Sequence, residues 1–253
     1  LKEKVIARRI VSDHLPRLAR SRIVVIPRVN ARESGLLEDD LASLVSHHVY
    51  GVSVGKIKSA EDVLYISELL AQQEKLAGLE IGFTKLILWI ETALAVVNAY
   101  QISASSTRII GVAFGAEDFA NDMGVFRTNV EYAKNVVCVA AKAAGVLALD
   151  TPFTNFRDLD GLRLDSCTAK GYGFNGKFAI HPEQIDVINQ EFTPSISETD
   201  YARRVVTAFE KAVLSGKGAV ELNGEMIDAP VAKRARSILN LASTVSDRCK
   251  AGG

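Results

Sequence analysis

The chain has 253 residues, of which 48% are hydrophobic and 24% are charged, a composition typical of a globular protein with a substantial core. Its 30 basic residues balance its 30 acidic residues, so the net charge gives no reason to expect bulk binding to nucleic acid or to an anionic membrane. No apolar run reaches the roughly 18 residues of a membrane span.

The first part of the chain predicts one helix and then a series of strands. Residues 1–18 have a helical pattern, without an initial Met or a signal-like apolar segment, so we expect the interior of a longer protein. Apolar runs then recur about every 30 residues, which is the length of a βα unit. Most are continuously apolar, as parallel strands covered on both faces are. These runs are 22–30, 50–57, 85–91, 108–115, 145–150 and 176–182.

Amphipathic stretches between the apolar runs predict helices. The stretch 59–75 begins at Ser59, and Asp62 stands where the second half of a capping box belongs. The stretch 129–145 ends at Gly145, a residue type that favours the C-cap. Alternating strands and helices of this kind build either a doubly wound sheet or a (β/α)₈ barrel.

The pattern changes after residue 192. We expect a turn, a helix, a Gly-rich segment with short strands, and a final helix, at 193–200, 201–215, 216–230 and 231–243. About six strands precede this region, whereas a closed barrel has eight. We therefore predict an α/β fold with a (β/α)₈ (TIM) barrel over 1–192, its first two strands missing, and an arm or lid over 193–253. An intact six-stranded open sheet is the alternative.

The three cysteines, Cys138, Cys167 and Cys249, are far apart and odd in number. This favours a reducing compartment over a disulfide scaffold or a zinc cluster. We expect the protein to be located in the cytoplasm, or in the mitochondrial matrix if the source is eukaryotic. The sequence contains no P-loop and no GxGxxG motif, so nucleotide hydrolysis and Rossmann-type redox chemistry have no support.

Polar residues follow the predicted strands at the edge where catalytic groups of a parallel barrel lie. Glu91 and Asp118 end neighbouring strands, one βα unit apart, and carboxylates at such positions suit Mg²⁺. Asp118 could instead cap the helix that follows it, whereas a carboxylate directly after the apolar LILWI run is harder to explain structurally. The full set is Arg28, Asn30, Lys56, Glu91, Thr92, Glu117, Asp118, Asp150 and His181.

Four positions have two interpretations each. Arg28 can bind a carboxylate of a ligand or form an ordinary salt bridge. In the segment GFNGKFAIHP, Lys177 and His181 can contact phosphates. Alternatively, the segment forms a turn, and His181 makes its hydrogen bonds within the protein. Asp150, which precedes Thr151 and Pro152, can simply cap a loop. Spacing alone does not decide between them.

Several of these segments together resemble the citrate lyase β-subunit-like family of Mg²⁺-dependent aldolases and lyases. They include PRVNARESGLLEDDL (27–41), ILWIETALAVVNAYQIS (87–103), GVAFGAEDFANDMGVFRT (111–128) and GAVELNGEMIDAPVAKRARSIL (218–239), and the resemblance covers essentially the whole chain. It departs from the family where a "PK" motif reads Gly55–Lys56.

The resemblance implies a TIM barrel that assembles as a homotrimer or hexamer and makes or breaks a carbon–carbon bond in malyl-, citramalyl- or citryl-CoA. It implies that Glu91 and Asp118 hold Mg²⁺, that Arg28 binds the substrate carboxylate, and that Asp228 is an acid/base contributed to a neighbouring subunit. Glu91 and Glu117 are then expected to face the substrate, and Lys177 and His181 the CoA. A thioesterase, a malate synthase-type enzyme, a CoA-independent 2-oxo acid aldolase and a non-catalytic scaffold are the alternatives.

Overall fold

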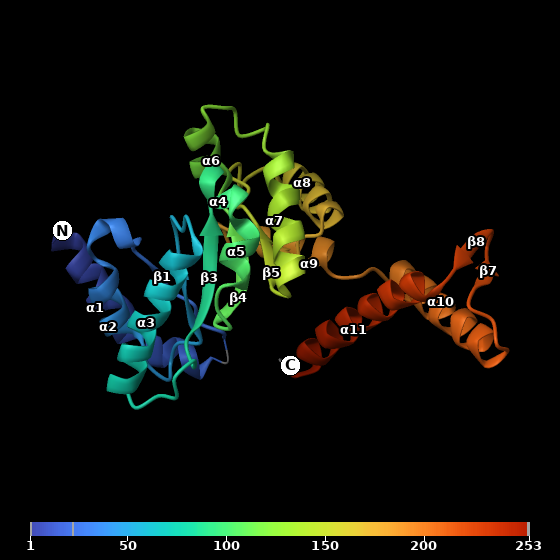
Figure 1. The fold of residues 1–253 in the computed structure, drawn as a ribbon, viewed down its shortest axis with the longest axis horizontal. Helices are drawn as coiled ribbons and strands as arrows, with labels where there is room; N and C mark the ends of the chain where they lie inside the picture. Colours follow the sequence, from blue (N-terminus) through green and yellow to red (C-terminus); the bar gives the residue numbers. More distant parts are fainter. Residues whose placement is uncertain (1, 22, 252–253) are drawn as a thin grey trace. The chain divides into compact units, whose positions relative to one another are not determined.

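The computed structural model describes residues 2–21 and 23–251, and the chain divides into two compact units. The first unit comprises Leu1–Thr154 and Thr168–Ile180, and the second comprises Asn155–Cys167 and His181–Gly253. Each unit is described by itself below (Figure 1).

The first unit contains a parallel sheet of six strands in sequence order, and each strand lies inside a range predicted from the sequence. The α/β prediction is therefore confirmed. Among the described residues, no ladder pairs the last strand with the first, so hydrogen bonds do not close the sheet into a ring. The strands are β1 (Arg28–Val29), β2 (Gly51–Val54), β3 (Lys85–Ile90), β4 (Ile109–Phe114), β5 (Leu147–Asp150) and β6 (Gly176–Lys177).

The central strands are buried because apolar side chains lie on both of their faces. Leu86, Leu88 and Ile90 of β3 are fully buried. On the alternate face, Ile87 and Trp89 pack with Ala113 of β4 in a small cluster that also includes Leu149 and Phe178. The continuous apolar runs of the sequence are thus the consequence of two covered faces.

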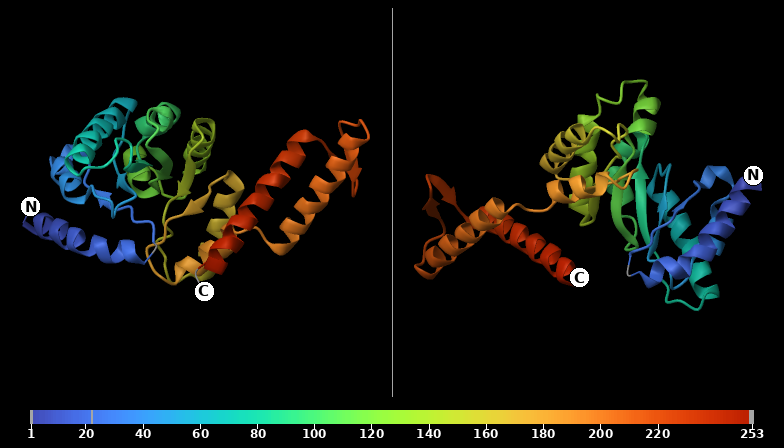
Figure 2. Two further views of the ribbon diagram at one scale, coloured as in Figure 1. Left: turned by 90° about the horizontal axis from the view of Figure 1, so that it is seen from below. Right: turned by 180° about the vertical axis from the view of Figure 1, so that it is seen from behind.

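Helices of the first unit pack in a row alongside the sheet, as Figure 2 shows. α2 (Leu37–Leu44) packs on α3 (Ala60–Leu76), α3 on α5 (Ala99–Ala104), and α5 on α7 (Glu131–Ala144), which also contacts β4 and β5. The remaining helices of this unit are α1 (Lys2–Arg20), α4 (Ala93–Val97) and α6 (Ala116–Met123), and a 3₁₀ turn spans Arg32–Ser34.

The predicted helix ends of α3 and α7 are confirmed. Ser59 is the N-cap of α3, and its capping box with Asp62 is complete. Gly145 is the C-cap of α7 and has a left-handed φ of 74°, a conformation that glycine adopts without the steric cost of a Cβ.

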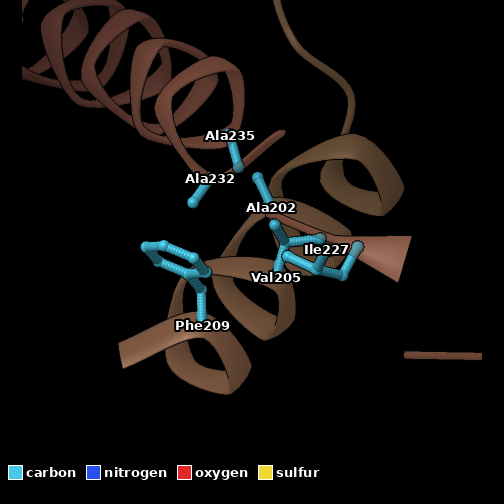
Figure 3. Packing of buried hydrophobic residues seen from close by; sticks show 6 residues of the cluster. All are labelled: Ala202, Val205, Phe209, Ile227, Ala232 and Ala235. Atoms are coloured by element: carbon cyan, nitrogen blue, oxygen red, sulfur yellow. The ribbon is translucent and has the colours of Figure 1, made fainter. Parts of the chain in front are cut away.

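α8 (Leu159–Tyr172) spans the boundary between the units, and the second unit continues with α9 (Gln184–Phe192), α10 (Ile196–Leu214) and α11 (Ala229–Ala251). The strands β7 (Val220–Leu222) and β8 (Glu225–Ile227) form an antiparallel hairpin, and Asn223 and Gly224 at its turn both have positive φ, as such turns require. Apolar side chains of α10, β8 and α11 meet in one cluster (Figure 3): Ala202, Val205, Phe209, Ile227, Ala232 and Ala235.

The predicted turn over 193–200 is wrong, because α10 already begins at Ile196. Ser195 caps this helix, and Glu198 completes a capping box with it. The sequence TPSISETD therefore contains a helix start, although its polar composition resembles a turn. Whether residues 193–253 act as an arm or lid stays a prediction.

Candidate active site

The ends of β1 to β4 place three of the predicted site residues close to one another. A Cβ placed on Gly55 would lie 3.0 Å from both Arg28 Nη2 and Glu91 Oε1, so the guanidinium and the carboxylate flank the same point after β2. The charges of Asp118, Arg28 and Lys56 all act on Glu91. Neighbouring strand ends of a parallel sheet thus bring together residues up to 90 positions apart in the sequence.

Glu91 is the buried acid of this group. The residue is 1% exposed, and its Oε1 accepts a hydrogen bond of 2.6 Å from the Lys56 backbone N–H. Burial raises the pKa of Glu91 above 4.5, and the nearby negative charge of Asp118 raises it further, although the hydrogen bond from Lys56 opposes this. The site therefore holds a carboxylate whose charge is incompletely compensated.

Asp118 lies in the first turn of α6, with its side chain half exposed. Its Oδ1 is 3.8 Å from the ammonium of Lys56. The alternative interpretation of Asp118 as the N-cap is wrong, because Gly115 occupies that position and Asp118 is three residues further along. The carboxylate is consequently available for a ligand while it still favours the positive end of the helix.

Mg²⁺ fits this donor set. The ion is typically held by one or two protein carboxylates, with water and substrate oxygens completing an octahedron. Glu91 and Asp118 supply two carboxylates, and the incompletely compensated buried charge of Glu91 would be neutralised by a cation. In the described part of the chain, no group of three or more His, Cys, Asp or Glu side chains is arranged to hold a metal.

Arg28 is held over an aromatic ring at the end of β1. Its guanidinium carbon lies 4.9 Å from the centre of the Trp89 ring. Trp89 is itself fixed by a hydrogen bond of 2.8 Å from its Nε1 to Ser53 Oγ, and it stacks on Phe178 at 4.7 Å. This stacking leaves the edge of an exposed guanidinium free to bind a carboxylate in a bidentate manner.

The two acidic neighbours of Asp118 perform structural tasks. Glu117 Oε1 lies 2.7 Å from Arg127 Nε, and Arg127 also donates to the carbonyl of Pro152 and to Thr154 Oγ1. Asp122 Oδ2 accepts a hydrogen bond of 2.7 Å from the Ala93 backbone N–H at the start of α4. Asp122 thus has a structural role, and a substrate contact of Glu117 stays a prediction.

The interpretation that Asp150 only caps a loop is wrong. The side chain is completely buried and lies 3.0 Å from Lys134 Nζ and 2.5 Å from Lys177 Nζ. The ammonium of Lys177 would have to leave this carboxylate to reach a phosphate. The predicted contact of Lys177 with CoA therefore stays a prediction.

His181 and Asp228 belong to the second unit. His181 stacks on Phe156 at 4.9 Å, and its Nδ1 accepts a hydrogen bond from the Glu183 backbone N–H. Asp228 precedes α11, where its Oδ1 accepts a hydrogen bond of 3.2 Å from the Val231 backbone N–H. Asp228 is thus a helix cap within its own unit, and the roles predicted for both residues in substrate chemistry stay predictions.

Sequence reasoning missed three contributors to this site: Gly55, Gly115 and Trp89. A Cβ on Gly115 would lie 2.9 Å from Glu91 Oε2, so the backbone after β4 passes directly beside the carboxylate. The signal for the glycines was a Gly immediately after an apolar strand, which marks a close approach of the backbone.

Among the described helices, none combines the length and the apolar character needed to cross a membrane. The family model described as HpcH/HpaI aldolase/citrate lyase matches residues 1–182. Citrate lyase subunit beta of Leuconostoc mesenteroides subsp. cremoris is 34% identical over 247 residues, covering 96% of this chain and 82% of that protein.

A mitochondrial citramalyl-CoA lyase of Rattus norvegicus is 33% identical over 235 residues, covering 87% of this chain and 69% of that protein. A crystal structure of the protein CitE from Mycobacterium tuberculosis, in complex with magnesium, acetoacetate and coenzyme A, superposes with a TM-score of 0.70 at 29% identity, covering 85% of this chain and 77% of that chain. These relatives establish the class of enzyme, a lyase. Family model and relatives together show that this chain belongs to the HpcH/HpaI aldolase/citrate lyase family.

Proposed function

We propose that the chain is a Mg²⁺-dependent carbon–carbon lyase that cleaves a hydroxyacyl-CoA thioester, such as malyl-, citramalyl- or citryl-CoA, into an acyl-CoA and an oxo acid. The observation that carries this proposal is the convergence of Glu91, Asp118 and Arg28 at the ends of adjacent strands. The magnesium and coenzyme A of the related CitE crystal structure support it.

Glu91 and Asp118 would hold Mg²⁺, which when bound supplies a Lewis acid for charge that develops on a substrate oxygen. Arg28 would bind the carboxylate of the oxo-acid portion through paired hydrogen bonds. Because its guanidinium rests on Trp89, little side-chain freedom is lost when the substrate binds.

In the cleavage direction the substrate hydroxyl would lose its proton to solvent water, the carbon–carbon bond would break, and the acyl thioester would leave as an enolate. Asp228, supplied by a neighbouring copy, would deliver a proton to the enolate carbon, which balances the proton lost from the hydroxyl. The cap hydrogen bond of Asp228 is accepted by Oδ1, so Oδ2 is the oxygen that would perform this task.

Assembly into a homotrimer or hexamer is part of this proposal, because Asp228 is expected to act in a neighbour's site. Exposed apolar side chains that gather between α5 and α7 offer a surface for such contacts. They include Val97, Tyr100, Tyr132 and Val139, which are 80%, 55%, 81% and 70% exposed. Location in the cytoplasm or the mitochondrial matrix stays a prediction.

The test is a product assay on malyl-, citramalyl- and citryl-CoA with Mg²⁺ present. We expect one of these thioesters to yield an acyl-CoA and an oxo acid, and Glu91→Ala to abolish the reaction. Asp228→Ala should lower kcat by about 100- to 10,000-fold, the range of general acid–base catalysis. Release of free CoA without carbon–carbon cleavage would instead identify a thioesterase, and full activity of Glu91→Ala in EDTA would refute the metal site.

A further inference from the structure

The carboxylate of Glu91 lies between two glycine residues that directly follow the strands on either side of it. Gly55 follows β2 and Gly115 follows β4, whereas Glu91 follows β3 between them. A Cβ on Gly55 would lie 3.0 Å from Oε1, and a Cβ on Gly115 would lie 2.9 Å from Oε2. Each oxygen of the carboxylate therefore faces a point where the neighbouring backbone has no side chain.

Turn geometry does not explain either glycine. Gly115 has a φ of −100°, and Gly55 is not among the residues with positive φ. Gly124 shows the opposite situation, since its φ is 65° and its missing side chain faces open space. At Gly55 and Gly115 it is the close approach of other atoms, and not the backbone conformation, that disfavours a side chain.

The contact at Gly115 is the more restrictive of the two. A Cβ there would also lie 2.7 Å from Glu91 Cβ, an atom that is bonded to the backbone and cannot rotate away. The two strands cannot separate freely at this point, because the Gly115 N–H donates a hydrogen bond of 3.0 Å to the Ile90 carbonyl. A side chain at this position must therefore displace the Glu91 side chain itself.

The contact at Gly55 involves the mobile ends of two side chains, Glu91 Oε1 and Arg28 Nη2. A methyl group at Gly55 would thus push the carboxylate and the guanidinium apart rather than block the fold. The next residue fixes the same oxygen directly, because Lys56 has a left-handed φ of 57° and its N–H donates to Oε1 at 2.6 Å. A positive φ in a non-glycine residue is a strained conformation that is found preferentially at functional sites.

We propose that Gly55 and Gly115 are positioning residues: their missing side chains let the backbones of β2 and β4 fix the Glu91 carboxylate in the orientation that binds the metal ion, and Gly55 also sets the separation between Glu91 and Arg28. This inference rests on the proposed role of Glu91 as a metal ligand. It assigns different consequences to the two glycines, because only Gly55 touches Arg28.

The experiment compares Gly115→Ala, Gly55→Ala and Gly111→Ala, with Mn²⁺ as the probe of the metal site in the absence of substrate. Gly111→Ala is the matched control, since it adds the same methyl group to β4 but meets Leu147 at 3.2 Å and not Glu91. Free Mn²⁺ is measured by electron paramagnetic resonance, and thermal unfolding with circular dichroism verifies that each variant is folded.

We expect Gly115→Ala to weaken Mn²⁺ binding by about 10- to 100-fold, the usual effect of losing a group that orients a metal ligand. Gly55→Ala should weaken Mn²⁺ binding less and should raise KM for the thioester substrate with a smaller change in kcat, because it displaces Arg28. Gly111→Ala should leave Mn²⁺ binding within about twofold of the wild type even if its stability falls.

Folded Gly115→Ala protein with wild-type Mn²⁺ affinity would overturn the inference, and so would an equal loss in Gly111→Ala. If Gly115→Ala does not fold, Gly55→Ala decides: unchanged Mn²⁺ affinity together with unchanged KM overturns the inference. Absence of Mn²⁺ binding in the wild-type protein would overturn both the metal site of the proposed function and this inference. Mn²⁺ binding that is weakened in Gly115→Ala and Gly55→Ala but kept in Gly111→Ala would support the inference even if every thioester assay were negative.

Discussion

At the scale of single residues, Glu91 is the position where a functional side chain lowers the stability of the fold. Its carboxylate is buried, faces a second acid, and has only partial compensation from Lys56 and Arg28. Folded proteins avoid such arrangements unless a ligand restores the balance. Glu91 therefore destabilises the folded state of the metal-free protein, and a bound cation would remove this destabilisation.

We predict that Glu91→Gln stabilises the metal-free protein at pH 7 by about 0.5–2 kcal/mol, the range of single stabilising substitutions. The folded state raises the pKa of Glu91 above 4.5, so the carboxylate costs stability once the pH exceeds that value, and the cost disappears when both states are protonated at lower pH. Urea unfolding at pH 7 and pH 4 in EDTA checks this. An equal difference between variant and wild type at the two pH values would contradict it.

At the scale of elements, the short helix α4 depends on side chains from outside its own residues. α4 has only five residues, and its first backbone N–H groups bond to Asp122 and Thr92. Asp122 comes from α6, so one helix supplies the cap of another. This cap holds the segment that directly follows Glu91.

We predict that Asp122→Ala destabilises the protein by about 1 kcal/mol, as the loss of a helix cap usually does. Asn121→Ala in the same helix is the matched control, because its exposed side chain does not bond to α4. Thermal unfolding of both variants checks the prediction. Equal stability of the two variants would show that the cap contributes nothing measurable.

At the scale of the whole first unit, a buried ion pair joins α3 to the beginnings of β3 and β4. Arg108 donates to both carboxylate oxygens of Glu74, at 2.6 and 2.8 Å, and Glu74 also accepts hydrogen bonds from the backbones of Gly82 and Thr84. Burial raises the pKa of Glu74, but these hydrogen bonds outweigh it and hold the pKa below 4.5. The pair fixes the end of the sheet where β3 and β4 begin, which is opposite the candidate active site.

We predict that Glu74→Ala destabilises the protein by about 3–5 kcal/mol, because it leaves the buried Arg108 without its partner. Since the folded pKa of Glu74 is lowered, its contribution is present above pH 4.5 and is lost as the pH falls through the folded pKa. The wild type should therefore lose stability below pH 4.5 more steeply than Glu74→Ala. Parallel pH profiles in denaturant titrations would contradict this.

At the scale of the assembly, we expect a particle of three or six copies of the 27.4 kDa chain. Val139→Glu should shift the particle toward smaller species, because a charge in an apolar contact surface must be desolvated. Sedimentation velocity checks both statements. Lys142→Glu is the control, because it changes a charge on the same helix but outside the exposed apolar surface between α5 and α7.

Much of the fold was determined by the sequence itself. Continuous apolar runs predicted all six parallel strands, because neither face of a strand that is covered on both sides is exposed to solvent. Ser59, Asp62 and Gly145 predicted helix ends, because capping is a local interaction between residues a few positions apart. The cap at Ser195 was missed although its capping box with Glu198 is equally local, because its polar neighbours look like a turn.

Only the tertiary structure decided what each strand-end residue touches. Asp150 bonds to Lys134 and Lys177, and Asp122 bonds to a backbone group of α4, partners that no local pattern names. The sequence could place Glu91 and Asp118 at the same edge of a sheet, because parallel strands end on one side. The glycine contacts that orient Glu91 depend on the separation and register of three strands, and these are set by packing across the whole unit.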